Sequence, residues 1–204
     1  MAEEITRIMY NSNGVIGMKQ NEVLNVFQYR RTHNLTTPID LTLFCYDKRY
    51  GHDDDEEFSE TVEMRTAMLE NIVHINHFTI LNFCKKRNTN LAWFNYLLHF
   101  LQTDHGGTTY AVHYRNLGGG SLHLSLEHVT RLSDAIRLNN NGHIESFSLF
   151  ALFVNTEEFQ TIWNTLLEMD VPQVNLAPSF PDKKRDITNN NTINFTGLST
   201  NRSL

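Results

Sequence analysis

The chain has 204 residues and a mass of 23.7 kDa, enough for one domain with a substantial hydrophobic core but short for two domains with tails. Hydrophobic residues make up 40% of it and aromatic residues 11%, which excludes an intrinsically disordered protein. The formal net charge of -6 argues against a uniformly basic surface for nucleic acid, although a local basic groove is compatible with it.

The first residues and the apolar runs indicate where the protein works. "MAEEITRIMYNSNG" carries acidic side chains where a signal peptide needs a basic start and an apolar run. No stretch reaches the roughly 18 apolar residues of a membrane helix. Cys45 and Cys84 lie far apart in apolar surroundings, which favours free buried thiols over a disulfide or a zinc site. We therefore expect a cytoplasmic or nuclear protein, or a component of a virion, with no membrane partner.

In chain order, residues 1–18 mix glycine and asparagine with isolated apolar residues, which predicts an arm docked on the domain. "QNEVLNVFQYRR" predicts a short helix, and "TPIDLTLFCYD" alternates like a strand. The acidic "GHDDDEEFSE" is typical of the start of a helix, and the apolar spacing after it predicts one long helix from about Phe58 to Phe83.

In the second half, a turn at "KKRNTN" precedes an apolar helix that ends near Gln102. "TTYAVHYRN" and "SLHLS", joined by "LGGG", predict a β-hairpin near 108–125. A helix over "SLEHVTRLSDAIRL" then leads to a strand near 144–154 and a helix over "NTEEFQTIWNTLLEMD".

Two of these later segments resemble each other. "LSLEHVTRLSDAI" aligns with "VNTEEFQTIWNTL", so that a polar residue, a glutamate and the inward apolar positions coincide. Any capped helix after a strand produces such a match, and a duplicated strand-helix unit would also produce it. Both interpretations stay open at this point.

The expected fold class is α+β, helix-rich. We expect a single globular core over 19–171 with several helices and a small antiparallel sheet, flanked by the arm at 1–18 and an extended tail at 172–204. The tail has too few apolar residues to fold alone, so it would be held by a groove or by a neighbouring subunit. The expected assembly residues are Phe180, Ile187, Ile193, Phe195 and Leu198.

A metal site can be tested at "ENIVHINH". On one long helix, Glu70, His74 and His77 would share a stripe and could present three ligands. A di-metal bundle site would need a second Glu-x-x-His on another helix, and the sequence has none. We therefore interpret the stripe as a solvated helix face and expect no metal.

The sequence also offers little for catalysis. In the predicted hairpin, His113 and His123 lie on opposite arms, where ordinary cross-strand pairing would bring them together. No serine has the G-x-S-x-G setting, and "LGGGSL" lacks the Gly-Lys-Ser/Thr ending of a phosphate-binding loop. We expect no catalytic residues and no cofactor.

Basic residues near aromatic ones suggest one possible groove for RNA or single-stranded DNA. Tyr110 and Tyr114 would supply the aromatic surfaces for stacking. The expected phosphate-contacting residues are Arg30, Arg31, Lys85, Lys86, Arg87 and Arg115.

The functional expectation is a non-enzymatic structural protein that self-assembles as a homo-oligomer through its terminal arms, in the manner of a viral coat or nucleocapsid subunit. The alternative is a single-stranded nucleic-acid-binding or regulatory protein that acts as a monomer or dimer. An enzyme that uses the histidine-rich middle of the chain comes third.

Overall fold

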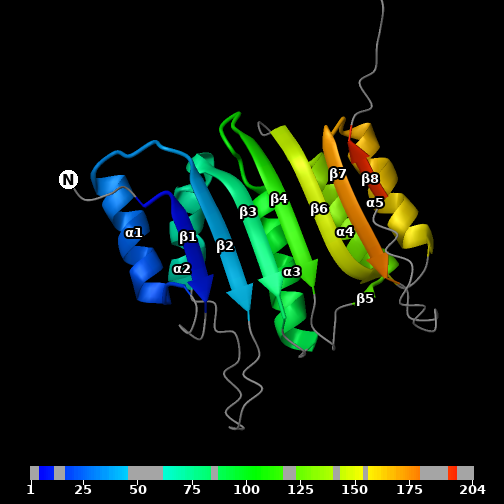
Figure 1. The fold of residues 1–204 in the computed structure, drawn as a ribbon, viewed down its shortest axis with the longest axis horizontal. Helices are drawn as coiled ribbons and strands as arrows, with labels where there is room; N and C mark the ends of the chain where they lie inside the picture. The colour runs from blue at the N-terminus through cyan, green and yellow to red at the C-terminus, as the bar shows by residue number, and fades with distance from the viewer. Residues whose placement is uncertain are drawn as a thin grey trace, which may run out of the picture.

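The computed structural model describes residues 5–11, 17–45, 62–83, 87–116, 123–139, 143–153, 156–179 and 193–196. These residues form one sheet with helices packed against it (Figure 1). The strands are β1 (Arg7–Asn11), β2 (Ile39–Cys45), β3 (Ile75–Asn82), β4 (Thr109–Asn116), β5 (His123–Leu124), β6 (His143–Phe153), β7 (Gln173–Ser179) and β8 (Ile193–Thr196). The helices are α1 (Gln20–Thr32), α2 (Val62–Glu70), the short 3₁₀ helix η1 (Ile72–His74), α3 (Arg87–Gln102), α4 (Leu126–Arg137) and α5 (Thr156–Glu168).

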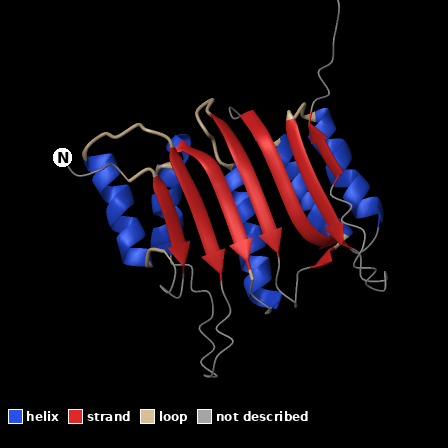
Figure 2. Cartoon of the chain, in the orientation of Figure 1, coloured by secondary structure: helices blue, strands red, loops and turns tan. Residues whose placement is uncertain are grey.

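The sheet is built almost in chain order. Its strand order is β1-β2-β3-β4-β6-β7-β8, and β5 pairs with the end of β6. Every pairing is parallel except the antiparallel pairing of β7 with β8 at the edge. A parallel crossover is right-handed in nearly all proteins, so successive steps in one direction place every connecting helix on the same face. Figure 2 shows the helices on one side of the sheet, which leaves the other side without a described helix.

The core lies between the helices and the face of the sheet that they cover. Alternate residues of each strand point into it, such as Leu41 and Leu43 in β2 or Phe147 and Leu149 in β6, all at most 1% exposed. The central helix α3 is apolar on most of its surface. Its buried side chains are Trp93, Phe94, Tyr96, Leu97, Leu98, Phe100 and Leu101.

The sheet corrects the expected fold class. The protein is α/β with a six-stranded parallel sheet, not α+β with a small antiparallel sheet. The predicted hairpin near 108–125 is wrong, because β4 and β5 do not pair with each other and each lies parallel to β6. The strand near 144–154 is confirmed as β6, but its neighbours β4 and β7 are both parallel to it.

The predicted long helix from 58 to 83 is also wrong. Helix α2 ends at Glu70, η1 forms one tight turn, and β3 begins at Ile75. The apolar residues of β3 alternate instead, with Phe78 and Ile80 buried while Thr79 is only half-buried. The helices expected around residues 20–31, up to 102, 125–138 and 155–170 are confirmed as α1, α3, α4 and α5.

Both expected arms contribute strands to the sheet. Residues 7–11 form β1 against β2, and residues 173–179 form β7 against β6. Ile8 and Tyr10 are buried in the core, as are Val174 and Leu176. The described parts of these segments are therefore held by their own sheet, because their alternating apolar residues complete its buried face.

The outer edge of β1 is met by a local turn. The Met18 N–H donates to the Met9 carbonyl at 2.7 Å, and the Asn11 N–H donates to the Met18 carbonyl at 3.1 Å. Gly17 has a φ of 93°, and a Cβ added there would lie 2.5 Å from the Met9 oxygen. Only glycine fits this close approach.

The strands begin at residues 7, 39, 75, 109, 143 and 173, so the fold repeats one strand-helix unit roughly every 30 to 36 residues. The two segments that resemble each other occupy equivalent places in it, since α4 follows β5 and α5 follows β6. Leu124 at the end of β5 is in register with Phe153 at the end of β6. Both interpretations predict this placement, because each puts a capped helix after a strand. In the described part of the chain, no helix combines the length and apolar character needed to cross a membrane.

Candidate functional site

The candidate site is the face of the sheet that carries no described helix, which we call the uncovered face. Strand residues that alternate with the core residues point to this side, and neighbouring strands align them in three rows. Three of them, Asn11, Ala111 and Ser148, are themselves buried. The amino-end row is Arg7, Asp40, His77, Ala111, Ser146 and Gln173. The middle row is Met9, Thr42, Thr79, His113, Ser148 and Asn175, and the carboxyl-end row is Asn11, Phe44, Leu81, Arg115, Phe150 and Ala177.

The amino-end row contains a charged group. The His77 imidazole Nδ1 lies 2.7 Å from an Asp40 carboxylate oxygen, and the Arg7 guanidinium lies 3.9 Å from the other oxygen. The three side chains come from adjacent strands in register, β1, β2 and β3. The Arg7 side chain is 82% exposed and the other two are about half exposed, so water screens these interactions.

The middle row is polar and centres on His113. Its register neighbours are Thr79 on β3 and Ser148 on β6, which place a hydroxyl on each side of the imidazole. Burial lowers the pKa of His113, and the positive charges of His77 and Arg115 lower it further. His113 is therefore neutral at pH 7, where it can both donate and accept hydrogen bonds.

The carboxyl-end row is aromatic with one cation. The Arg115 guanidinium carbon lies 4.6 Å from the centroid of the Phe150 ring, a cation–π contact. Phe44 packs against Phe83 with ring centroids 5.4 Å apart. Phe44, Leu81 and Phe150 are all half-buried, so this row offers apolar surface that a partner could cover.

The uncovered face carries acid-base, hydrogen-bonding and apolar side chains. Asp40 and His77 pair as a carboxylate and an imidazole do in hydrolases, but in the described part of the chain no hydroxyl or thiol is hydrogen-bonded to His77. Among the described residues, no group of three or more His, Cys, Asp or Glu side chains could hold a metal ion. The rows provide hydrogen-bonding groups, two exposed cations (Arg7 and Arg115) and apolar surface.

Of the residues predicted to bind nucleic acid, the described ones lie on different elements. Arg30 is 1% exposed, and its guanidinium donates to the Ile5 and Thr37 carbonyls, so it serves the fold. Arg31 pairs with Glu70 on α2. Arg115 lies on the uncovered face, whereas the predicted stacking residues Tyr110 and Tyr114 are buried under the helices. Lys85 and Lys86 lie outside the described residues, as does the Arg87 side chain.

The predicted assembly residues lie partly outside the described chain. Ile193 and Phe195 belong to β8, in register with Leu176 and Val174 of β7. Phe180, Ile187 and Leu198 are not among the described residues.

The stripe of Glu70, His74 and His77 does not form, because the three residues belong to three elements. Glu70 pairs with Arg31, and His77 pairs with Asp40. Burial lowers the pKa of His74, and the nearby Arg30 charge lowers it further. The predicted pairing of His113 with His123 is wrong as well, since their strands are not neighbours.

Sequence reasoning missed the uncovered face. Its residues are the polar partners of apolar residues in alternating strands, such as Asp40 and Thr42 in "IDLTLF". Alternation of strands with helices along the chain was the available signal, because it predicts a parallel sheet with a defined strand order.

The fold and this face define a class: an open α/β protein of repeated strand-helix units, with its helices on one side. In a doubly wound sheet the strand order changes direction once, and ligands bind in the crevice at that point. The described strands of this sheet follow one another in a single direction, so they form no such crevice. Compared with protein-family models, curated proteins and solved structures, the chain matches none of them.

Proposed function

We propose that the protein is a non-enzymatic binding protein that holds a protein partner against the uncovered face of its sheet. The observation that carries the proposal is the alignment of polar, charged and aromatic side chains from six strands into three rows. Repeat proteins whose units stack side by side present extended surfaces of this kind to their partners.

The partner's chemistry follows from the rows. Arg115 lies on the Phe150 ring, and among the described residues no carboxylate contacts it. A partner carboxylate opposite Arg115 would balance this charge, and apolar side chains beside it would cover Phe44, Leu81 and Phe150. The mixture of Asp40 with the cations suits a protein surface better than a phosphate backbone.

Site-specific photocrosslinking in the cells that make the protein tests this proposal. Benzoylphenylalanine replaces Thr79 on the uncovered face or Gln160, an exposed residue of α5. We expect discrete protein adducts from position 79 that are absent from position 160 and are lost when Arg115→Glu is added. The same adducts from both positions, or adducts that survive Arg115→Glu, would contradict the proposal.

Self-assembly, expected from the sequence, is a second candidate. Its specific support is the position of β8 at the edge of the sheet, since an edge strand can pair with a strand of another copy. Light scattering on the full chain separates the two candidates. A concentration-dependent oligomer that Ile193→Lys abolishes would favour assembly, and a monomer at all concentrations would remove it. Adducts of RNA at position 79 would favour the nucleic-acid-binding alternative.

A further inference from the structure

The uncovered face carries two histidines and an arginine close together on β3 and β4. His113 and Arg115 are two residues apart on β4, so both side chains point to this face. His77 on β3 is in register with Ala111, which places it diagonally beside His113. His77 and Arg115 are exposed, and His113 in the row between them is half-buried. This group, which we call the basic cluster, combines one permanent cation with two imidazoles that can each gain a proton.

The carboxylates of the neighbouring strands lie near the amino ends of those strands. The other charged side chains and imidazoles of the described strands are Arg7, Asp40, His123, His143 and Glu145. Asp40 on β2 pairs with His77, whose Nδ1 lies 2.7 Å from the carboxylate. Glu145 lies at the irregularity where β6 pairs with the first residues of β4. In the described part of the chain, neither carboxylate contacts His113 or Arg115, so a carboxylate of a partner can approach both.

The proton on His113 determines the charge of this surface. Burial lowers the pKa of His113 below its usual 6.5, and the charges of His77 and Arg115 lower it further. The imidazole is therefore neutral at pH 7.5. When it gains a proton, a second positive charge stands about 7 Å along the strand from Arg115, the spacing of alternate residues. The partial burial of His113 makes that charge costly unless a negative group lies opposite it.

We propose that His113 makes the uncovered face bind its acidic partner more tightly at acidic pH. This inference rests on the function proposed above and assigns the regulation of the same surface. A partner carboxylate opposite Arg115 would also lie near His113, where it stabilises the protonated imidazole. Binding then raises the pKa of His113, so the complex takes up a proton. By linkage, protonation of His113 strengthens binding by the same factor.

The direction of the pH dependence follows from the lowered pKa of His113. At pH 7.5 the imidazole is neutral in both the free and the bound protein, and it contributes no charge to binding. As the pH falls below about 6.5, the bound protein is protonated before the free protein, so the affinity rises. One proton allows a change of at most about tenfold per pH unit. Carboxylates of the partner, whose ordinary pKa is about 4, keep their charge down to pH 5.5.

NMR titration of the histidine rings in the full-length protein tests the basic cluster without a partner. The His113 ring should titrate with a pKa below 6.5, and Arg115→Gln should raise this pKa because it removes a neighbouring positive charge. A His113 pKa at or above 6.5, or one that Arg115→Gln leaves unchanged, would overturn the proposal.

Fluorescence anisotropy with the full-length protein tests the binding. The probe is a rhodamine-labelled peptide of four Glu-Phe repeats, which offers carboxylates to Arg115 and rings to the apolar row, and its control replaces each glutamate with glutamine. Between pH 7.5 and pH 5.5 we expect the affinity for the glutamate peptide to rise about fivefold, the effect of one additional charge pair on an exposed surface. His113→Gln should remove this rise, because glutamine keeps hydrogen-bonding groups but cannot gain a charge.

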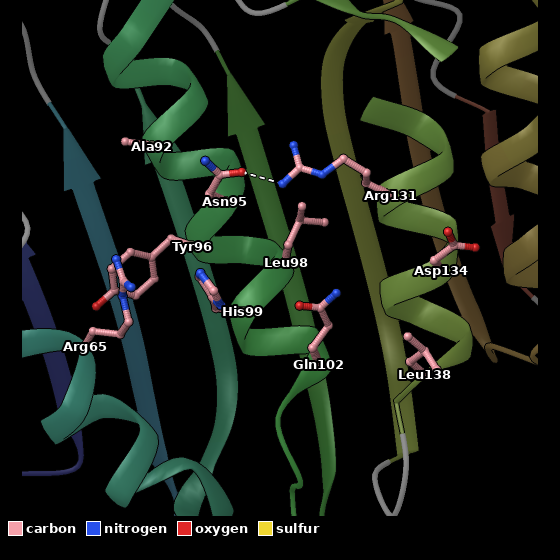
Figure 3. A pocket seen from close by; sticks show the side chains of 10 residues that line it. All are labelled: Arg65, Ala92, Asn95, Tyr96, Leu98, His99, Gln102, Arg131, Asp134 and Leu138. Carbon is pink, nitrogen blue, oxygen red and sulfur yellow. Dashed lines mark hydrogen bonds between the residues drawn. The ribbon is translucent and has the colours of Figure 1, made fainter. Parts of the chain in front are cut away.

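The matched control is His99→Gln, which removes an exposed imidazole from α3 on the helix-covered side of the sheet. Figure 3 shows His99 among the side chains that line a pocket between α2, α3 and α4. This variant should retain the rise in affinity. Unchanged affinity between the two pH values, an equal rise for the glutamine peptide, or a rise that persists in His113→Gln would overturn the proposal.

Failure of this inference can be told apart from failure of the proposed function. If position 79 gives protein adducts but the Glu-Phe peptide binds at neither pH value, the acidic partner and its pH dependence are wrong, while a partner on the uncovered face remains. Absence of adducts from position 79 would contradict the proposed function itself, whatever the pH dependence of the peptide.

Discussion

The two faces of the sheet use the same strands for different purposes. In β6, Phe147 points to the helices and is fully buried, whereas Phe150 points to the uncovered face and is half-buried beneath Arg115. In β2, Leu41 and Leu43 belong to the core, whereas Asp40 and Thr42 alternate with them and point to the other side. Alternation thus assigns one set of strand residues to the core and the other set to the proposed binding surface.

This separation predicts which substitutions should destabilise the fold and which should not. Substitutions on the helix-covered face create cavities in a packed core, and substitutions on the uncovered face remove contacts that water or a partner can replace. Pairs of residues close together in the sequence but on opposite faces therefore give the most informative comparisons.

The largest expected effect separates Phe147 from Phe150. Phe147→Ala should reduce the free energy of unfolding by about 3 to 5 kcal/mol, because it leaves a cavity under the helices. Phe150→Ala should cost about 1 kcal/mol while reducing the crosslinking from position 79. Urea denaturation measures both changes. Equal losses of stability in the two variants would show that the faces do not differ as described.

Arg30 and Arg31 give the next largest contrast. The Arg30 guanidinium donates to the Ile5 carbonyl at 3.2 Å and to the Thr37 hydroxyl at 3.1 Å, and it also bonds to the Thr37 carbonyl. Arg30→Ala should destabilise the fold by about 3 kcal/mol, because a buried guanidinium loses its hydrogen bonds and leaves a cavity.

The neighbouring Arg31→Ala should cost less than about 1 kcal/mol, because its pair with Glu70 is exposed. Thermal unfolding checks both arginine variants. If Arg30→Ala folded as stably as Arg31→Ala, the structural role of Arg30 would be wrong and a surface role would return.

Buried His105 should make the stability depend on pH. It stacks on Tyr110 at 4.0 Å, and its Nε2–H donates to the Phe100 carbonyl at 2.9 Å. Burial lowers its pKa in the folded state, outweighing that hydrogen bond and the Asp104 charge, which raise it. At acidic pH the unfolded chain therefore binds the proton more readily than the folded protein.

His105 consequently contributes stability that is present above pH about 6.5 and lost as the pH falls through its folded pKa. The loss should reach at most about 1.4 kcal/mol per pH unit for this one proton. His105→Phe keeps the aromatic stacking and should flatten the dependence between pH 7 and pH 5. Urea denaturation across this range measures it, and an unchanged slope would assign the effect to His74 or His113, whose pKa values are also lowered.

The smallest expected effect is on the uncovered face. Asp40→Asn removes the carboxylate between Arg7 and His77, and the change in stability should be below about 1 kcal/mol because all three side chains are exposed. Differential scanning calorimetry provides the measurement. A loss above 2 kcal/mol would mean that this group supports the fold.

Sequence reasoning recovered elements whose periodicity is unambiguous. Helices α4 and α5 follow a repeat of apolar residues that fits only a helix, and Ile39, Leu41 and Leu43 fit only a strand. It failed at "IVHINHFTIL", where Ile72 and Ile80 are spaced as on one face of a helix while Phe78 and Ile80 alternate as in a strand. The short helix η1 ends the helical segment, so the residues after it form a strand.

The uncovered face could not be predicted from local sequence patterns. Glycines between two alternating segments are typical of a hairpin, but the direction of β4 and β5 is set by their common neighbour β6. Likewise, no local signal places Thr79 beside His113 or His113 beside Ser148, because strand order and register determine those neighbours. Arg115 was identified as a binding residue, but the surface around it was not.

The turn at Gly17 limits how far the sheet can grow. A parallel sheet that adds one strand per repeated unit has no natural end, and its outermost strand is a template for other chains. At β1, two backbone groups of that template are occupied by Met18, and this contact depends on a residue without a side chain. Any larger residue at position 17 would displace the turn and expose the strand. One glycine thus allows the chain to cover part of the edge at which a strand of another chain could pair.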